Sequence, residues 1–325
     1  MTDLRNVHQK RVAVSGRFPD FSKAELEILL RARGAWQVTN TASKDTFAML
    51  SAEATGKKPD KARELGVPIL LPEDVRAALG APLEGYRERL AFRIADRPNY
   101  YKNAVLHIGD PASDALIARI EERIGFPLPE AARNLYRQLD GISWLWTIPK
   151  LQDTVDAPLP WNEACHQDGE LWRRLADLQK HNKSRFTMGL ICIPPAETVF
   201  FEQWDGRMFS SDAYGPKDTV KVGTRKLKAK EFFRNLFIFD AFHGYYQAGL
   251  WADPEEQTFN IVYGSDYGAD WTWCKPIPFE IYMEYLAWEF GSNRIIDLVA
   301  KLGRTTSMHR WHPRTWMQLE PYREL

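Results

Sequence analysis

The chain has few cysteines, and none of them lies near another. Its three cysteines are Cys165, Cys192 and Cys274. Their odd number and wide spacing argue against a disulfide framework and against a zinc site. Such cysteine usage is typical of a protein that works in the reducing cytosol.

Two further features are missing, namely an excess of charge of one sign and a long apolar run. Lys and Arg number 43 and so do Asp and Glu, so no overall field draws the chain to nucleic acid, and any such site must be a local patch. No segment approaches the ~20 apolar residues that span a bilayer. The first residues lack the apolar core of a signal peptide. We expect a cytoplasmic protein that binds no membrane.

The first quarter of the chain alternates strand-like and helix-like segments. Ser22 and Glu25 have the spacing of a capping box, which predicts a helix from Ser22 to Arg33. Strands are predicted at Val12–Val14, Phe47–Leu50 and Ile69–Leu71. Strands that alternate with helices predict an α/β unit with a small parallel sheet.

The end of the first strand has the composition of a phosphate-binding site. Ser15 and Gly16 follow the apolar residues directly, and a later basic run contains Lys57, Lys58 and Lys61. A glycine lets the backbone approach an anion, and the start of the following helix offers free N–H groups. The alternative is that Ser15 only caps a turn and Lys61 is a solvated helix residue.

This run resembles a BRCT domain of the type found in bacterial NAD-dependent DNA ligases. VAVSG is similar to the family's first strand and its Ser/Thr-Gly phosphate motif, and Gly34 to the glycine that ends its first helix. The later motifs that match are DKARELGVPIL and LPEDVRAAL. The resemblance implies that Ser15, Gly16 and Lys61 contact an anion, which would be a DNA nick, a DNA end or a phosphopeptide.

Two departures from the family bear on that ligand. LPEDVRAAL lacks the Trp that many phosphopeptide-binding members carry, and no second BRCT segment follows. Both favour DNA binding or plain protein docking over phosphopeptide recognition.

The remainder of the chain has the pattern of an α+β unit. A connector precedes it, with a predicted helix over Tyr86–Ile94. Helices are predicted from Ser113 and Pro129, followed by several strands and then the amphipathic segment PFEIYMEYLAWEFG. Helices, then strands, then helices predict an antiparallel sheet flanked by helices.

That order resembles the SUKH superfamily, which includes bacterial immunity proteins. The segments that carry the resemblance are IGFPLPEAARNLYRQLDG, IPPAETVFF, YGSDYGADWTW and PFEIYMEYLAWEF. The resemblance implies a binding module without catalytic residues that captures a protein partner. We therefore expect two domains with flanking segments: BRCT-like over 8–80, a connector over 81–112, SUKH-like over 113–303, and an extension over 304–325.

A partner surface is predicted where tryptophans fall in irregular or acidic segments. Trp and Tyr are favoured at interfaces because they bury much area at low entropy cost. A core role is the alternative for each of them. The predicted partner-binding residues are Trp144, Trp146, Trp251, Asp253, Glu255 and Glu256, and the acidic ones suit a basic partner such as a nuclease toxin.

Catalytic motifs are missing. There is no nucleophile elbow, no Walker A loop and no dinucleotide fingerprint. His309 with His312, and Asp266 with Asp270, are better explained by surface or turn roles. We expect no enzyme, cofactor or metal, but a SUKH-type protein that neutralises a toxin and carries a BRCT adaptor. The alternatives are a DNA-repair or DNA-end scaffold and an unrecognised hydrolase that uses His and Asp residues.

Overall fold

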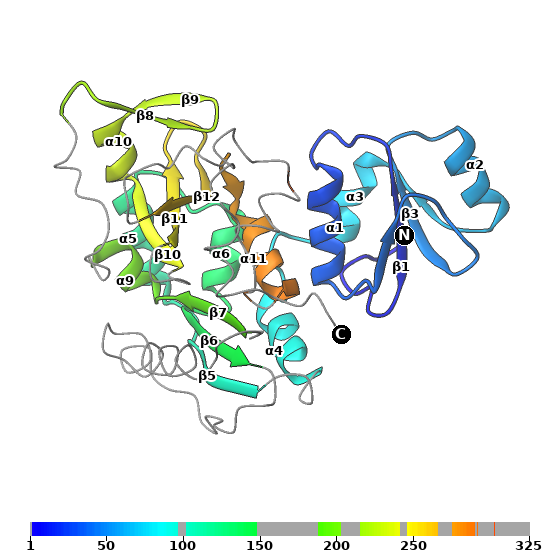
Figure 1. Cartoon of the computed structure of the whole chain (residues 1–325), viewed down its shortest axis with the longest axis horizontal. Helices are drawn as coiled ribbons and strands as arrows, with labels where there is room; N and C mark the ends of the chain where they lie inside the picture. Colours follow the sequence, from blue (N-terminus) through cyan, green and yellow to red (C-terminus); the bar gives the residue numbers. More distant parts are fainter. Residues whose placement is uncertain are drawn as a thin grey trace, which may run out of the picture.

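In this computed structural model, the N-terminal part of the chain builds a four-stranded parallel sheet (Figure 1). The structure describes residues 2–96, 102–147, 188–202, 215–240, 246–265 and 275–289, with Gly291 and Leu302. The first elements are β1 (Arg11–Ser15), α1 (Lys23–Ala32), β2 (Gln37–Thr39), β3 (Thr46–Ser51), α2 (Lys57–Glu64), β4 (Ile69–Leu70) and α3 (Pro72–Leu79). The strand order is β2-β1-β3-β4, and all neighbours are parallel.

Strand alternation assigns the two faces of this sheet to different helices. Val12 and Val14 belong to the main apolar core together with residues of α1 and α3, whereas Ala13 and Met49 pack with Ala62 of α2. Figure 1 accordingly places α1 and α3 on one side of the sheet and α2 on the other. The predicted small parallel sheet is confirmed.

Helix α1 begins as its sequence predicts. The backbone N–H of Glu25 donates to Oγ of Ser22 at 3.2 Å, and the N–H of Ser22 donates to Oε2 of Glu25 at 2.7 Å. This reciprocal pair satisfies two N–H groups that the first helical turn leaves without partners. By contrast, β2 was not predicted, because it is a strand of only three residues and all three are half-buried.

The remaining elements build two antiparallel sheets and a hairpin. They are α4 (Tyr86–Asp96), β5 (Lys102–Ile108), α5 (Asp114–Ile124), α6 (Glu130–Tyr136), β6 (Ile142–Thr147), β7 (Met188–Ile193), α9 (Ala196–Phe201), β8 (Thr219–Val222), β9 (Arg225–Lys228), α10 (Ala229–Arg234), β10 (Leu236–Asp240), β11 (Tyr246–Asp253), β12 (Thr258–Ser265), β13 (Ile277–Pro278) and α11 (Phe279–Glu289). The sheets have the orders β5-β6-β7 and β10-β11-β12-β13, and β8 pairs with β9. The predicted antiparallel pairing is confirmed.

The segment predicted as a connector carries structure that belongs to these sheets. Its helix α4 was expected, but β5 was not, and β5 pairs along its length with β6. The strand was missed because an isolated alternating segment beside prolines gives no sign of a partner some forty residues away. No described helix has the length and apolar character needed to cross a bilayer.

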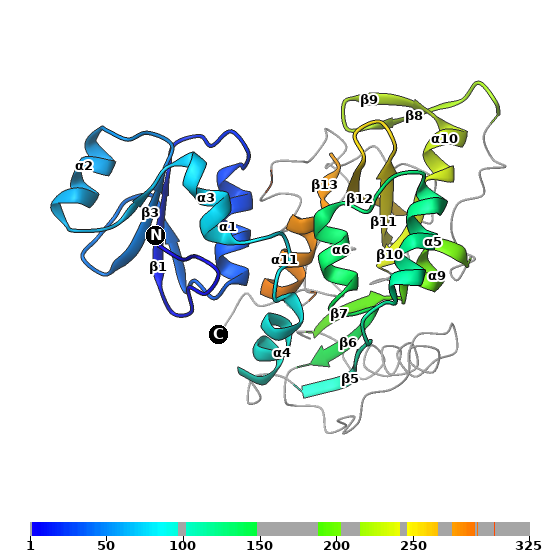
Figure 2. The same cartoon turned by 180° about the vertical axis from the view of Figure 1, so that it is seen from behind.

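Helix α11 joins the parallel sheet to the rest of the molecule. It packs against α1, and the two helices lie side by side in both views (Figures 1 and 2). One apolar cluster runs through this contact from the parallel sheet to the antiparallel sheets. The structure therefore shows a mixed α/β arrangement with a shared core, and the division into two domains stays a prediction.

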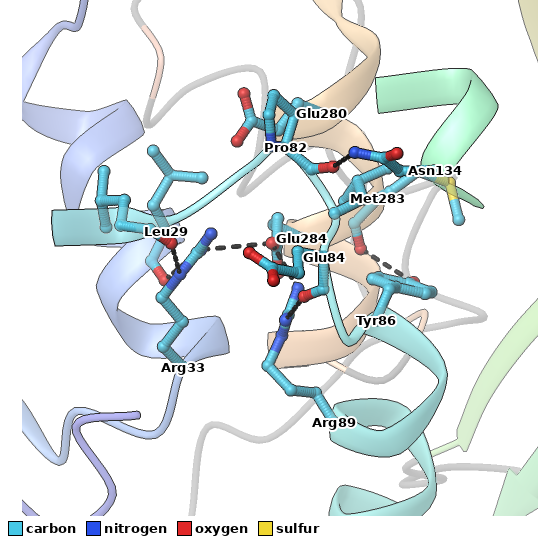
Figure 3. A network of polar contacts seen from close by, with 12 residues as sticks. Leu29, Arg33, Pro82, Glu84, Tyr86, Arg89, Asn134, Glu280, Met283 and Glu284 are labelled. Carbon is cyan, nitrogen blue, oxygen red and sulfur yellow. Dashed lines mark hydrogen bonds and ion pairs between the residues drawn. The ribbon is translucent and has the colours of Figure 1, made fainter. Parts of the chain in front are cut away.

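Charged side chains are buried at this junction (Figure 3). The side chain of Glu284 in α11 is fully buried, and its carboxylate lies 3.2 Å from the guanidinium of Arg33 and 2.6 Å from that of Arg89. The hydroxyl of Tyr86 donates to the carbonyl of Met283 at 3.0 Å. These contacts tie residues at the end of α1, in α4 and in α11 to one another.

Candidate functional site

The candidate phosphate site lies where β1 and β3 end. Ser15 and Ser51 are register partners at the last position of the two strands. Alternation along each strand puts both on the face that α2 covers. Ser51 donates its hydroxyl to the carbonyl of Glu53 at 2.8 Å, whereas the Ser15 hydroxyl has no hydrogen-bonding partner among the residues that the structure describes. It is therefore available to an anion.

Gly16 allows a close backbone approach at this edge. Its φ is +90°, and a Cβ there would lie 2.5 Å from Cβ of Ala52. The N–H of Ala52 donates to the carbonyl of Ser15 at 2.9 Å, which holds the two strand ends together. Any residue with a side chain would strain this turn.

Helix α2 starts at the same edge, because the chain enters it directly from the end of β3. Gly56 precedes it with a φ of +121°, and no side chain caps the helix. Lys57, Lys58 and Lys61 are exposed and form no ion pair within the described part of the chain. The predicted site residues thus lie on neighbouring elements, but no hydrogen bond links Lys61 to Ser15 or Gly16.

The prediction that three tryptophans form an exposed partner surface is wrong. Trp144 and Trp146 are 0% exposed, and Trp251 is 3% exposed. The first two lie on β6, the central strand of its sheet, where both faces are covered. Trp251 lies on β11 and packs against Phe232 at 5.8 Å between ring centroids. Their segments are strands and not loops, and the sheet faces on which these three side chains lie are covered.

The acidic cluster beside Trp251 is partly neutralised by an arginine of the same chain. Asp253 is buried and pairs with Arg225, which also pairs with Glu255 at a distance of 2.5 Å. The guanidinium of Arg225 lies 5.2 Å from the ring of Trp251. Glu255 and Glu256 are exposed. The single positive charge of Arg225 offsets one of the three negative charges of the cluster, so part of the charge that was expected to attract a basic partner stays at the surface.

The remaining chemical candidates give no second site. Asp266, Asp270, His309 and His312 lie outside the described residues. Across the ranges that the structure covers, no three His, Cys, Asp or Glu side chains come together in an arrangement that could hold a metal ion.

Asp140 is a partly buried carboxylate that the sequence did not single out. Burial raises its pKa to about 6, although the backbone N–H of Ala196, which donates to Oδ1 at 2.6 Å, acts in the opposite direction. The negative charge of Glu197 raises the pKa further. This carboxylate connects the turn before β6 to the start of α9.

Asp140 makes stability fall as the pH rises. Because its folded pKa lies above the ordinary value of about 3.9, its stabilising contribution is complete below about pH 4 and is lost as the pH passes through 6. We expect Asp140→Asn to remove this dependence, up to about 3 kcal/mol. Denaturant unfolding of both proteins at pH 4.5 and 7.5 measures it. Parallel pH profiles would contradict the assignment.

Comparison with known proteins finds similarity to DNA ligases over part of the chain. No protein-family model matches the chain. Over 70 residues, 22% of its length, the chain is 34% identical to a DNA ligase of Francisella philomiragia and 36% identical to one of Francisella tularensis subsp. novicida. The match covers 10% of each ligase, so the chain spans about a tenth of the length of these relatives. A segment of the chain is therefore similar to a segment of DNA ligases.

Proposed function

We propose that this protein binds DNA through a BRCT-type segment over residues 8–80, and that it serves as a non-enzymatic DNA-end or nick scaffold. The observation that carries the proposal is the similarity to DNA ligases. The match spans 70 residues, which is close to the length of the segment over 8–80. The phosphate contacts assigned to it are the Ser15 hydroxyl, the backbone at Gly16 and the ammonium group of Lys61.

The local chemistry supports a phosphate ligand. A terminal phosphate offers oxygens that accept hydrogen bonds. Within the described part of the chain the Ser15 hydroxyl has no hydrogen-bonding partner, and it lies beside a turn that Gly16 keeps free of side-chain atoms. The exposed lysines of α2 add positive charge at the same edge. The opposite face of the sheet is not available, because α1 packs on α11.

The toxin-neutralising alternative has weaker support. It rests on the SUKH resemblance, and the three tryptophans of its predicted partner surface are buried in the sheets. The SUKH resemblance, the toxin partner and the hydrolase alternative remain predictions that no contact described above favours.

The test compares two DNA probes. Fluorescence anisotropy is measured with a nicked duplex that carries a 5′-phosphate at the nick and with the same duplex lacking that phosphate. We expect the wild-type protein to prefer the phosphorylated probe, and Ser15→Ala with Lys61→Ala to reduce this preference at least tenfold, since charge-assisted contacts to one phosphate are lost. Lys44→Ala, an exposed lysine that precedes β3 at the other edge, is the control and should keep the preference. A wild-type protein that binds both probes equally would refute the proposal.

A further inference from the structure

The segment from Lys217 to Arg234 concentrates positive charge in a chain whose total charge is zero. Seven lysines and arginines but only two acidic residues fall within it. It forms the hairpin β8–β9 and the short helix α10. In both views this hairpin lies at the end of the molecule farthest from the parallel sheet (Figures 1 and 2).

The apolar side of the hairpin is fixed to the body of the protein. Val220 and Val222 are buried in a cluster with Phe232 of α10 and with Trp251 and Val262 of the antiparallel sheet. The hairpin is therefore held in place by packing, and its other face is set by strand alternation.

That other face presents lysines. Lys221 lies directly opposite Lys226 in the register, and both are exposed. Lys228, at the next outward position of β9, pairs with Glu231 at 3.1 Å in an exposed contact that contributes little. Lys221 and Lys226 have no anionic partner within the described ranges. Three further cations of the same segment, Lys217, Lys230 and Arg234, are also exposed.

Like charges that face each other across two strands destabilise a hairpin. The pairing of Lys221 with Lys226 is thus unfavourable for the protein alone, and an anion that lies over both relieves the repulsion. Arg225, on the packed face, is already neutralised by Asp253 and Glu255 and does not add to this surface.

The geometry fits a polyanion with regularly spaced charges. Outward residues on one strand, such as Lys226 and Lys228, repeat about every 6.8 Å. Phosphates of one DNA strand repeat about every 3.4 Å along the duplex axis, so lysines on this face match every second phosphate. A backbone contact of this kind needs no base recognition and no terminal phosphate.

We propose that the outer face of the β8–β9 hairpin, centred on Lys221 and Lys226, is a second DNA-binding surface that contacts the phosphodiester backbone of a duplex. It is separate from the edge at Ser15. It increases affinity for any duplex, whereas the edge at Ser15 discriminates between phosphorylated and unphosphorylated nicks.

The test uses the full chain and a blunt 20-base-pair duplex with neither a nick nor a 5′-phosphate. Lys221→Glu with Lys226→Glu is expected to weaken binding at least tenfold at 100 mM salt and to reduce the slope of log Kd against log salt by about 2. The preference for a phosphorylated nick, measured as the ratio of two affinities, should stay unchanged. The charge-matched control is Lys44→Glu with Arg137→Glu, two exposed positions outside the hairpin.

Several results would contradict the proposal that the hairpin binds DNA and would leave the proposed function of the Ser15 site unaffected. These are unchanged duplex binding by the hairpin variant, an equal loss in the control variant, and displacement of the duplex by polyglutamate at the same charge concentration. Unchanged binding together with new self-association in size-exclusion chromatography would show instead that the lysines only keep the hairpin from pairing with other chains. Circular dichroism confirms that each variant is folded. Loss of nick discrimination in Ser15→Ala with Lys61→Ala tests the other site independently.

Discussion

Replacing Glu284 with alanine is expected to lower the free energy of unfolding by about 3–5 kcal/mol, because it leaves a buried arginine without its counter-ion. The Arg33 side chain is 1% exposed and that of Glu284 is 0% exposed. Burial lowers the pKa of Arg33 from its ordinary value even with Glu284 beside it, so desolvation already outweighs the attraction. Urea unfolding measures the loss.

Two control variants separate the buried charge from the mere loss of an ion pair. Glu280→Ala removes a bidentate partner of Arg76 at 3.0 and 3.1 Å, but that arginine side chain is 41% exposed, so we expect a loss of about 1 kcal/mol at most. The triple change Arg33→Met, Arg89→Met and Glu284→Leu removes the charges together, and we expect it to be more stable than Glu284→Ala. If Glu284→Ala lowers the free energy of unfolding no more than Glu280→Ala does, the argument from the buried charge is contradicted.

This network also explains why the parallel sheet and the sheets that follow it belong to one structure. Arg33 ends α1, Arg89 lies in α4, and both converge on a carboxylate of α11. Apolar residues surround these charges in a core that is continuous across the junction. We infer that separating the first eighty residues from the remainder would expose both the charges and this core.

The sequence predicted those parts of the fold that depend on neighbours in the chain. The capping box of Ser22 and Glu25 needs only residues three apart, and the buried strands β1 and β3 are recognisable from their own apolar residues. By contrast, β5 depends on β6 for its pairing, and nothing in its own composition identifies that partner. Tertiary context decided its structure.

The candidate sites divide in the same way. Ser15 at the end of a strand was recognisable from residue order, and parallel topology places it beside the end of β3. The burial of Trp144 and Trp146 could not be predicted, because it depends on distant segments that cover the faces of the sheet at β6. The charge of the β8–β9 hairpin is visible in the sequence, but the pairing of Lys221 with Lys226 depends on the register that the intervening turn sets.

Gly16→Ala is expected to destabilise the protein by about 2–5 kcal/mol. A side chain at a positive φ costs about 1–2 kcal/mol, and overpacking at a contact this short adds about 1–3 kcal/mol. The contact in question is between the new methyl group and Cβ of Ala52, at 2.5 Å. Because the turn would have to move, we also expect the preference for a phosphorylated nick to fall. Urea unfolding and the nicked-duplex assay measure the two effects.

The two contributions can be separated within the same chain. Gly66 has a φ of +71°, and a Cβ added there has no atom within 4 Å. The loss of stability in Gly66→Ala therefore measures the backbone strain alone. Ala52→Gly in the background of Gly16→Ala removes the steric contact and keeps the strain. We therefore expect a double-mutant cycle between positions 16 and 52 to give a coupling energy of about 1–3 kcal/mol. Purely additive effects would mean that the strand ends separate freely, and then Gly16 would not hold the phosphate site in its present shape.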